Sequence, residues 1–216
     1  MLTRRTFVAF VLKGLSVLSL SVGAFSLGVR RIWANAKKTV IPRGTRREEL
    51  IGKNPADLDT SRLEVTPLAD FGTMGLDDYK VDLDKWRLVV DGKVENPLSS
   101  KYSEILDLPS IEKTVLLICP GIFTNNGTWN GFYIRELLKT AHVKDGAAYV
   151  TVRGPQGNYE KVEKFPLNEA RSDKMFLAYQ VNGVKLPVKH GFPLRLVAEG
   201  RYGTQWVKYV WNVRVD

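Results

Sequence analysis

The order of hydrophobic and polar residues predicts a chain of short strands. Residues 86–90 and 114–118 are apolar, β-prone runs that end at turn residues, Asp91-Gly92 and Pro120-Gly121 respectively. The Asp91-Gly92 pair predicts a tight hairpin turn, after which a strand resumes at residues 93–94. Residues 206–215 alternate between two faces, and this period predicts a half-buried final strand.

Helical spacing is confined to short segments. Residues 102–108, 132–141 and 167–171 predict helices, and in the second of these Phe132, Ile134, Leu137 and Leu138 fall on nearly one face. Further strands are predicted at residues 147–152, 177–181 and 193–197, a turn at Asn182-Gly183, and a polar loop at 124–128. Strands predominate and helices lie irregularly between them. We therefore expect an α+β domain of mixed, mostly β sheets with short interspersed helices.

The start of the chain has the pattern of an export signal. Arg4-Arg5, within Thr-Arg-Arg-x-Phe, precedes an apolar stretch at residues 8–29, as in a twin-arginine leader. Ala34-Asn35-Ala36 offers a small-x-small cleavage site, although the apolar stretch is also long enough for an uncut membrane anchor. The predicted organisation is a leader at 1–36, a linker or surface-hugging arm at 37–62, and one domain at 63–216. The domain is expected to be periplasmic or otherwise exported, and to meet a membrane only through its leader.

The basic charge does not indicate a nucleic-acid partner. The formal charge of +9 includes five basic residues in the leader, and without them 27 basic residues face 23 acidic ones. Nucleic-acid binding requires a denser basic face. The balance suits a small anionic ligand better.

Several enzyme classes lack their motifs. The sequence has no Gly-x-Ser-x-Gly elbow, no phosphate loop and no Gly-x-Gly-x-x-Gly. Two histidines and one cysteine do not suit a zinc enzyme, and one cysteine cannot form an internal disulfide. Cys119 ends an apolar strand, so two readings stay open from spacing alone: a small buried hydrophobe, or a thiolate that binds a metal carried by an organic cofactor.

Four blocks, in order, resemble the sulfite oxidase superfamily. The first is the cysteine segment, with Leu117-Ile118-Cys119, Trp129-Asn130-Gly131-Phe132, Ile134 and Leu137-Leu138. The others are the run from Asn182 to Pro187, the run from His190 to Arg195, and Tyr202-Gly203 with Val207-Lys208. The resemblance implies a sulfite oxidase-type molybdopterin-binding fold with molybdenum-molybdopterin as cofactor. It assigns Cys119 as the molybdenum ligand and catalytic residue. It also assigns His190, Arg195 and Lys208, with the backbone around Trp206 and Val207, to binding of the pterin and its phosphate.

The segment 66–73 looks like the arm that closes over the cofactor in periplasmic methionine sulfoxide reductases. By this resemblance Thr66 and Asp70 are cofactor-binding residues. An arginine suits a pterin phosphate because it can donate two parallel hydrogen bonds, and a lysine suits it as a point charge. Between residues 185 and 216, six Lys or Arg face two acids, which places a cationic excess in the matching region.

The turn after Cys119 departs from true sulfite oxidases. It contains no arginine, whereas a dianionic substrate needs several strong donors. The favoured function is two-electron oxygen-atom transfer on a small S-oxide or a related oxide. The alternatives are sulfite oxidation and a metal-free binding module with the same fold. With no haem-attachment or iron-sulfur cysteines, electrons are expected to pass to or from a separate partner, such as a membrane cytochrome or a soluble carrier.

Overall fold

The computed structural model describes residues 38–216, so the predicted leader at 1–36 lies outside the described residues. Residues 39–216 form one compact unit. Within this described part, no helix is both long enough and apolar enough to cross a bilayer. The secondary structure confirms the expected α+β class, with strands in the majority.

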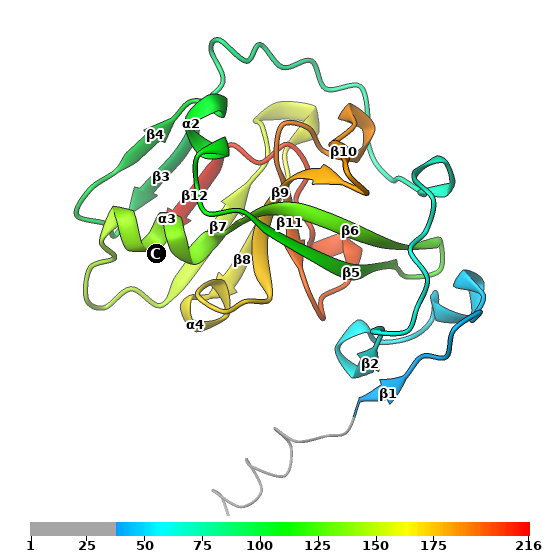
Figure 1. Ribbon diagram of the computed structural model, residues 1–216. Coiled ribbons are helices and arrows are strands. Elements are labelled where there is room, and N and C mark those ends of the chain that lie inside the picture. Colours follow the sequence, from blue (N-terminus) through cyan, green and yellow to red (C-terminus); the bar gives the residue numbers. More distant parts are fainter. Residues whose placement is uncertain (1–37) are drawn as a thin grey trace, which may run out of the picture. The chain divides into compact units, whose positions relative to one another are not determined.

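The first sheet contains the strand that ends at Cys119. Its strand order is β10-β9-β6-β5, with β11 also paired to β9 and every pairing antiparallel. Figure 1 shows β5 and β6 as long neighbouring strands. The strands of this sheet are β5 (Ile111–Cys119), β6 (Phe123–Tyr133), β9 (Met175–Val181), β10 (Val184–Lys185) and β11 (Arg195–Ala198).

The second sheet has the order β4-β3-β12-β7-β8. Its β12 runs parallel to β3 and antiparallel to β7. The strands are β3 (Leu88–Gly92), β4 (Leu98–Ser100), β7 (Tyr149–Arg153), β8 (Val162–Pro166) and β12 (Asn212–Val215). The helices are short and lie between strands: α2 (Tyr102–Leu106), α3 (Ile134–Ala141) and α4 (Leu167–Ala170). Single 3-10 turns occur at η3 (Leu68–Asp70), η4 (Gly157–Tyr159), η5 (Val188–His190) and η6 (Gly203–Gln205).

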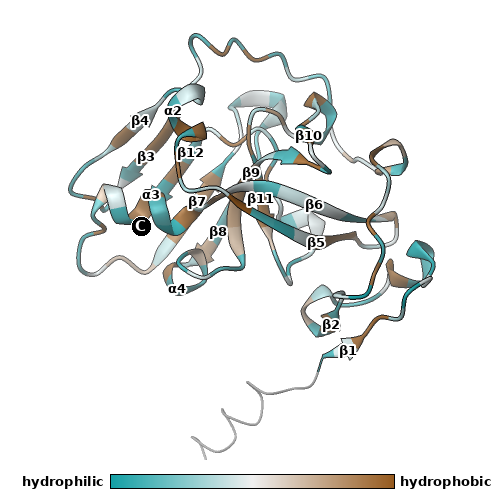
Figure 2. Ribbon diagram, viewed as in Figure 1, coloured by the Kyte–Doolittle hydropathy of each residue, from teal (hydrophilic) through white to brown (hydrophobic). Residues whose placement is uncertain are grey.

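An N-terminal arm, which we define as residues 39–76, covers one face of β5 with its first part. It contains β1 (Thr39–Val40), η1 (Arg47–Leu50), η2 (Pro55–Asp57) and β2 (Leu58–Asp59). Its apolar side chains, Ile41, Leu50, Leu58 and Leu63, form a cluster with Leu116 and Ile118 of β5. The other face of β5 joins the main core through Val115, Leu117 and Cys119. Burial on both faces explains why the strand is apolar without alternation, and Figure 2 shows hydrophobic colour on strands of both sheets.

The predicted polar loop after Cys119 is wrong, because residues 124–128 belong to strand β6. The polar side chains are buried there because the arm supplies their hydrogen-bond partners. Asn125 exchanges two hydrogen bonds with the backbone of Gly72, each 2.9 Å long. The Asn126 side chain donates to the carbonyls of Leu63 and Glu64. The polarity of residues 124–128 predicted a loop. These residues instead form a strand, because the arm, far away in the sequence, pairs with their polar groups.

Three other boundaries differ from the sequence expectation. The hairpin turn is not at Asp91-Gly92, because Gly92 lies inside β3 and a Cβ there would sit 2.0 Å from the Val215 carbonyl oxygen of β12. Glycine therefore serves a close approach of two strands, and β4 begins only at Leu98. The helix α3 begins at Ile134, with Phe132 still in β6. The last strand is limited to Asn212–Val215, since Tyr209 has a left-handed backbone (φ 58°) that interrupts the extended chain.

Candidate functional site

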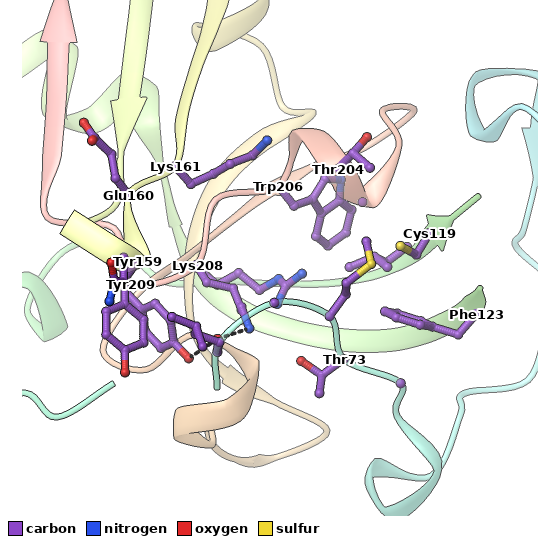
Figure 3. A pocket seen from close by; sticks show the side chains of 18 residues that line it. Thr73, Cys119, Phe123, Tyr159, Glu160, Lys161, Thr204, Trp206, Lys208 and Tyr209 are labelled. Atoms are coloured by element: carbon purple, nitrogen blue, oxygen red, sulfur yellow. Dashed lines mark hydrogen bonds between the residues drawn. The ribbon is translucent and has the colours of Figure 1, made fainter. Parts of the chain in front are cut away.

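Cys119 faces a cavity of about 280 Å³. Leu117, two residues earlier on β5, lines the same cavity, as expected for residues on one face of a strand. The thiol is only 3% exposed, and burial raises its pKa, while the positive charge of Arg195 acts in the opposite direction. Figure 3 shows Cys119 on one side of the cavity, near Phe123, with Trp206 and Lys208 on other walls. The cysteine is therefore buried but borders a hollow, which a plain core residue would not.

Arg195 is a buried cation beside this cavity. It begins β11, is 8% exposed, and its guanidinium lies 5.7 Å from the ring centroids of both Trp129 and Trp206. One Nη donates to the carbonyl of His190 at 2.9 Å, whereas Nε has no hydrogen-bond partner. Burial lowers the Arg195 pKa to about 10.

No carboxylate of residues 38–216 forms an ion pair with Arg195. A buried charge without a counter-ion is costly to the fold. The uncompensated positive charge of Arg195 therefore favours binding of an anion in the cavity.

Lys208 adds a second cation to the wall. Its Nζ donates to the carbonyls of Leu76 (2.8 Å) and Lys189 (3.4 Å). Burial, together with repulsion from Arg195, lowers its pKa to about 8. The turn at Gly191 places Arg195 and Lys208 next to each other, since a Cβ on that glycine would lie 3.2 Å from the Arg195 Cβ and 3.3 Å from Lys208.

His190 lies behind the cavity wall instead of lining it. The side chain is 2% exposed, and its ring packs edge-on against Phe71 with centroids 5.5 Å apart. Nε2 is buried without a hydrogen-bond partner. Burial, with repulsion from Arg195 and neighbouring lysines, lowers the His190 pKa to about 4. The imidazole is therefore neutral at physiological pH.

Acidification is expected to destabilise the ligand-free protein through His190. Its pKa is about 4 in the folded protein, and histidine titrates near 6.5 in an unfolded chain, so the unfolded chain binds the additional proton between these values. The stability from this group is complete above about pH 6.5 and falls as the pH drops toward 4. Urea unfolding at about pH 7.5 and about pH 4.5 measures how far the free energy of unfolding falls on acidification. We expect this fall to be smaller by about 2–3 kcal/mol in His190→Gln than in the parent protein. Equal losses in both proteins would contradict this assignment.

Of the four remaining sequence-predicted residues, one borders the cavity, and Val207, Thr66 and Asp70 do not. Trp206 lines the cavity, and its indole N–H donates to the carbonyls of Ala198 and Arg201. Val207 is fully buried, and its carbonyl accepts from the backbone N–H of Leu196 in the fold itself. Thr66 and Asp70 lie outside the cavity lining.

Thr66 and Asp70 instead hold the arm in place. The Thr66 hydroxyl accepts from the backbone N–H of Asn126, and Asp70 is exposed, with a carboxylate oxygen 3.6 Å from Arg47. The arm reaches the cavity a few residues later, through Gly72, Thr73, Met74, Gly75 and Leu76, which we call the lid segment. The Thr73 hydroxyl donates to the Lys189 carbonyl at 3.0 Å.

Sequence reasoning also missed another part of the cavity wall. It contains residues 158–161 around η4, and Tyr209. Lys161 lines the cavity, and its Nζ pairs with Glu163 at 2.6 Å. The signal in the sequence was weak, because single tyrosines and lysines in loops carry no pattern. The left-handed backbone of Tyr209, which costs a non-glycine residue about 1–3 kcal/mol, is visible only in the structure.

Comparison with known proteins gives one family and several relatives. Residues 75–216 match the family described as "Oxidoreductase molybdopterin binding domain". An uncharacterized oxidoreductase of Bacillus subtilis (strain 168), YuiH, is 28% identical over 137 residues, which cover 63% of this chain and 68% of the relative. The NADH nitrate reductase of Volvox carteri is also 28% identical, over 60% of this chain and 18% of the relative.

Among solved structures, the sulfane dehydrogenase SoxCD of Paracoccus pantotrophus is similar, with a TM-score of 0.60 and 20% sequence identity. The likeness covers 86% of this chain and 52% of that one. It supports the fold. This chain spans only about half of that protein and less than a fifth of the nitrate reductase.

Proposed function

Since the chain belongs to the family of the oxidoreductase molybdopterin binding domain, we propose that it is an exported enzyme that transfers an oxygen atom to or from a small S-oxide or related oxide. Enzymes of this family are oxidoreductases that use molybdenum-molybdopterin. The observation that carries the proposal is the buried guanidinium of Arg195, which has no counter-ion among residues 38–216 and lines the cavity that Cys119 borders.

The residues at the cavity fit this cofactor. The phosphate of molybdopterin is a compact anion, and Arg195 presents a buried Nε with no partner. Lys208 has three N–H donors, of which two reach backbone carbonyls. The unpartnered Nε2 of His190 lies close by, beneath the same wall. Arg195 and Lys208 would hold the phosphate, and Cys119 would bind the metal through its thiolate.

Bound molybdenum-molybdopterin supplies the two-electron oxygen-transfer chemistry. The chain contributes position and charge. Arg195 favours the thiolate of Cys119 against the effect of burial, and a thiolate is the form that binds a soft metal. Leu117, Phe123 and Trp206 add apolar surface to the cavity that Cys119 borders.

A neutral oxide suits the substrate position better than a dianion. The turn at residues 120–122 has no basic side chain. Arg195 and Lys208 are assigned to the cofactor, and Lys161 is already paired with Glu163. Met74, Leu117 and Phe123 contribute apolar surface near Cys119. A dianion would lack the several strong donors that it needs.

A substrate panel tests this proposal. With molybdenum-loaded protein and artificial electron donors or acceptors, we expect kcat/KM for neutral S-oxides to exceed that for sulfite by at least about 100-fold. Related N-oxides are expected to react more slowly than S-oxides but faster than sulfite. Sulfite oxidation as fast as S-oxide reduction would favour the sulfite-oxidising alternative, and no turnover by loaded protein would favour a binding module.

Export and the electron partner are parts of the same proposal. The twin-arginine pattern at Arg4-Arg5 supports transport of a protein already folded around its cofactor. This chain has one cysteine, so it has no means to bind a haem or an iron-sulfur cluster by the usual cysteine motifs. Electrons would therefore be exchanged with a separate carrier, either a membrane cytochrome or a soluble protein.

A further inference from the structure

Two consecutive side chains converge on one oxygen atom of the lid segment. The Nζ of Lys208 and the hydroxyl of Tyr209 both donate to the carbonyl of Leu76, at 2.8 Å and 3.2 Å. These contacts join positions 132 and 133 residues apart in the sequence. Both donors also line the cavity. The lid segment is thus fastened by residues of the cavity wall itself.

The backbone of Tyr209 makes this convergence possible. In an extended strand, successive side chains point to opposite faces. Tyr209 instead has a φ of 58°, and the chain turns there. As a result Lys208 and Tyr209 lie on the same side, with the ammonium 5.4 Å from the ring centroid. A left-handed tyrosine persists only where its surroundings fix it.

Aromatic contacts supply that fixation. The Tyr209 ring lies 4.8 Å from Tyr79 and 5.8 Å from Tyr159, measured between centroids, and Tyr79 and Tyr159 also touch each other. The Tyr159 hydroxyl donates to the Asp78 carboxylate at 2.5 Å. Asp78 and Tyr79 follow the lid segment after a single residue, Asp77. Tyr209, which is 2% exposed, is therefore the centre of a clamp on the chain that leaves the lid.

We propose that Tyr209 is a positioning residue, which holds the lid segment closed and aims the ammonium of Lys208 into the cavity. Lys208 donates two of its N–H groups to the carbonyls of Leu76 and Lys189, and the third can donate to an anion. Closure of the lid and binding of the anion are then linked through one side chain. Only the identity of that anion, the cofactor phosphate, rests on the proposed function.

A tyrosine that merely fills space would keep its role when only its hydroxyl is removed. Tyr209→Phe retains the ring contacts and loses the hydrogen bond to Leu76. In ligand-free protein, we expect the backbone amide of Gly72, which donates to the Asn125 side chain at 2.9 Å, to exchange hydrogen about fivefold faster in this variant. Tyr149→Phe, at a tyrosine that is 45% exposed on β7, is the matched control and is expected to leave that exchange unchanged.

Inorganic phosphate provides the second readout, by calorimetric titration of the same ligand-free proteins. We expect its dissociation constant to rise about fivefold in Tyr209→Phe, with no change in Tyr149→Phe. Parental exchange at the Gly72 amide would overturn the positioning of the lid, and parental phosphate affinity would overturn the positioning of Lys208. Should Tyr209→Phe not fold, Lys208→Met replaces it in the exchange experiment, because it removes the other donor to Leu76. Neither readout requires molybdenum, so both remain decisive if the proposed enzyme function fails.

Discussion

Cys119→Ala is expected to abolish turnover in protein that is otherwise folded. Loss of groups that only support a metal ligand costs about 10–100-fold, so loss of the ligand itself is expected to reduce kcat/KM by more than about 100-fold. The thiol occupies little volume, and it borders the cavity, so its removal leaves the rest of the core in contact. Activity with the preferred oxide, at matched protein concentration, measures the effect.

Val115→Ala is the control for that experiment. Val115 lies on the same face of β5 and is 2% exposed, but it does not line the cavity. Its truncation is expected to lower stability by about 1–3 kcal/mol without a comparable loss of kcat/KM. A Cys119→Ala variant that retains activity within a few-fold of the parent would exclude the thiolate as the metal ligand.

Arg195→Met is expected to stabilise the ligand-free protein and to weaken its hold on the cofactor. The ligand-free fold bears the cost of a buried guanidinium with no counter-ion among residues 38–216. Methionine, an unbranched apolar side chain, removes that cost, a gain of about 1–3 kcal/mol. Charge-assisted hydrogen bonds to a phosphate are worth about 1.5–3 kcal/mol each. Loss of this donor is therefore expected to weaken cofactor retention by about 10–100-fold.

A binding residue is distinguished from a structural one when its substitution raises the stability of the ligand-free protein but weakens cofactor retention in the loaded protein. Thermal unfolding of the ligand-free proteins and cofactor release from the loaded proteins measure the two effects. Arg201→Met is the matched control, because Arg201 makes a two-point ion pair with Glu169 away from the cavity. It is expected to leave retention unchanged. A destabilised ligand-free Arg195→Met with parental retention would show that the guanidinium serves only the fold.

The sequence predicted those parts of the fold that local pattern controls. The apolar run ending at Cys119 is strand β5, and the Asn182-Gly183 turn joins β9 to β10. Residues 124–128 were misread because their polarity is satisfied by the arm, about 50 to 80 residues earlier. The predicted final strand is too long, because the alternation of apolar and polar residues continues through Tyr209. The left-handed backbone of Tyr209 depends on contacts with Tyr79 and Tyr159, which are distant in the sequence.

The candidate site divides in the same way. Cys119, Arg195, Trp206 and Lys208 carry recognisable motif positions, and the structure brings them to one cavity. The sequence indicated a closing segment at residues 66–73, and the structure places Gly72 and Thr73 of that segment in the cavity lining, while Thr66 and Asp70 lie outside it. Closure of the lid segment depends on hydrogen bonds from Lys208 and Tyr209, more than 130 residues away. No local pattern records contacts of that separation.

X-ray absorption at the molybdenum edge tests the bond between Cys119 and the metal most directly. The parent protein and Cys119→Ser are prepared from a host that makes molybdopterin, and the sulfur neighbours of molybdenum are compared. We expect the serine variant to show one sulfur neighbour fewer than the parent, or to contain no molybdenum. Identical sulfur coordination in the two proteins would contradict the assignment of Cys119 as the ligand.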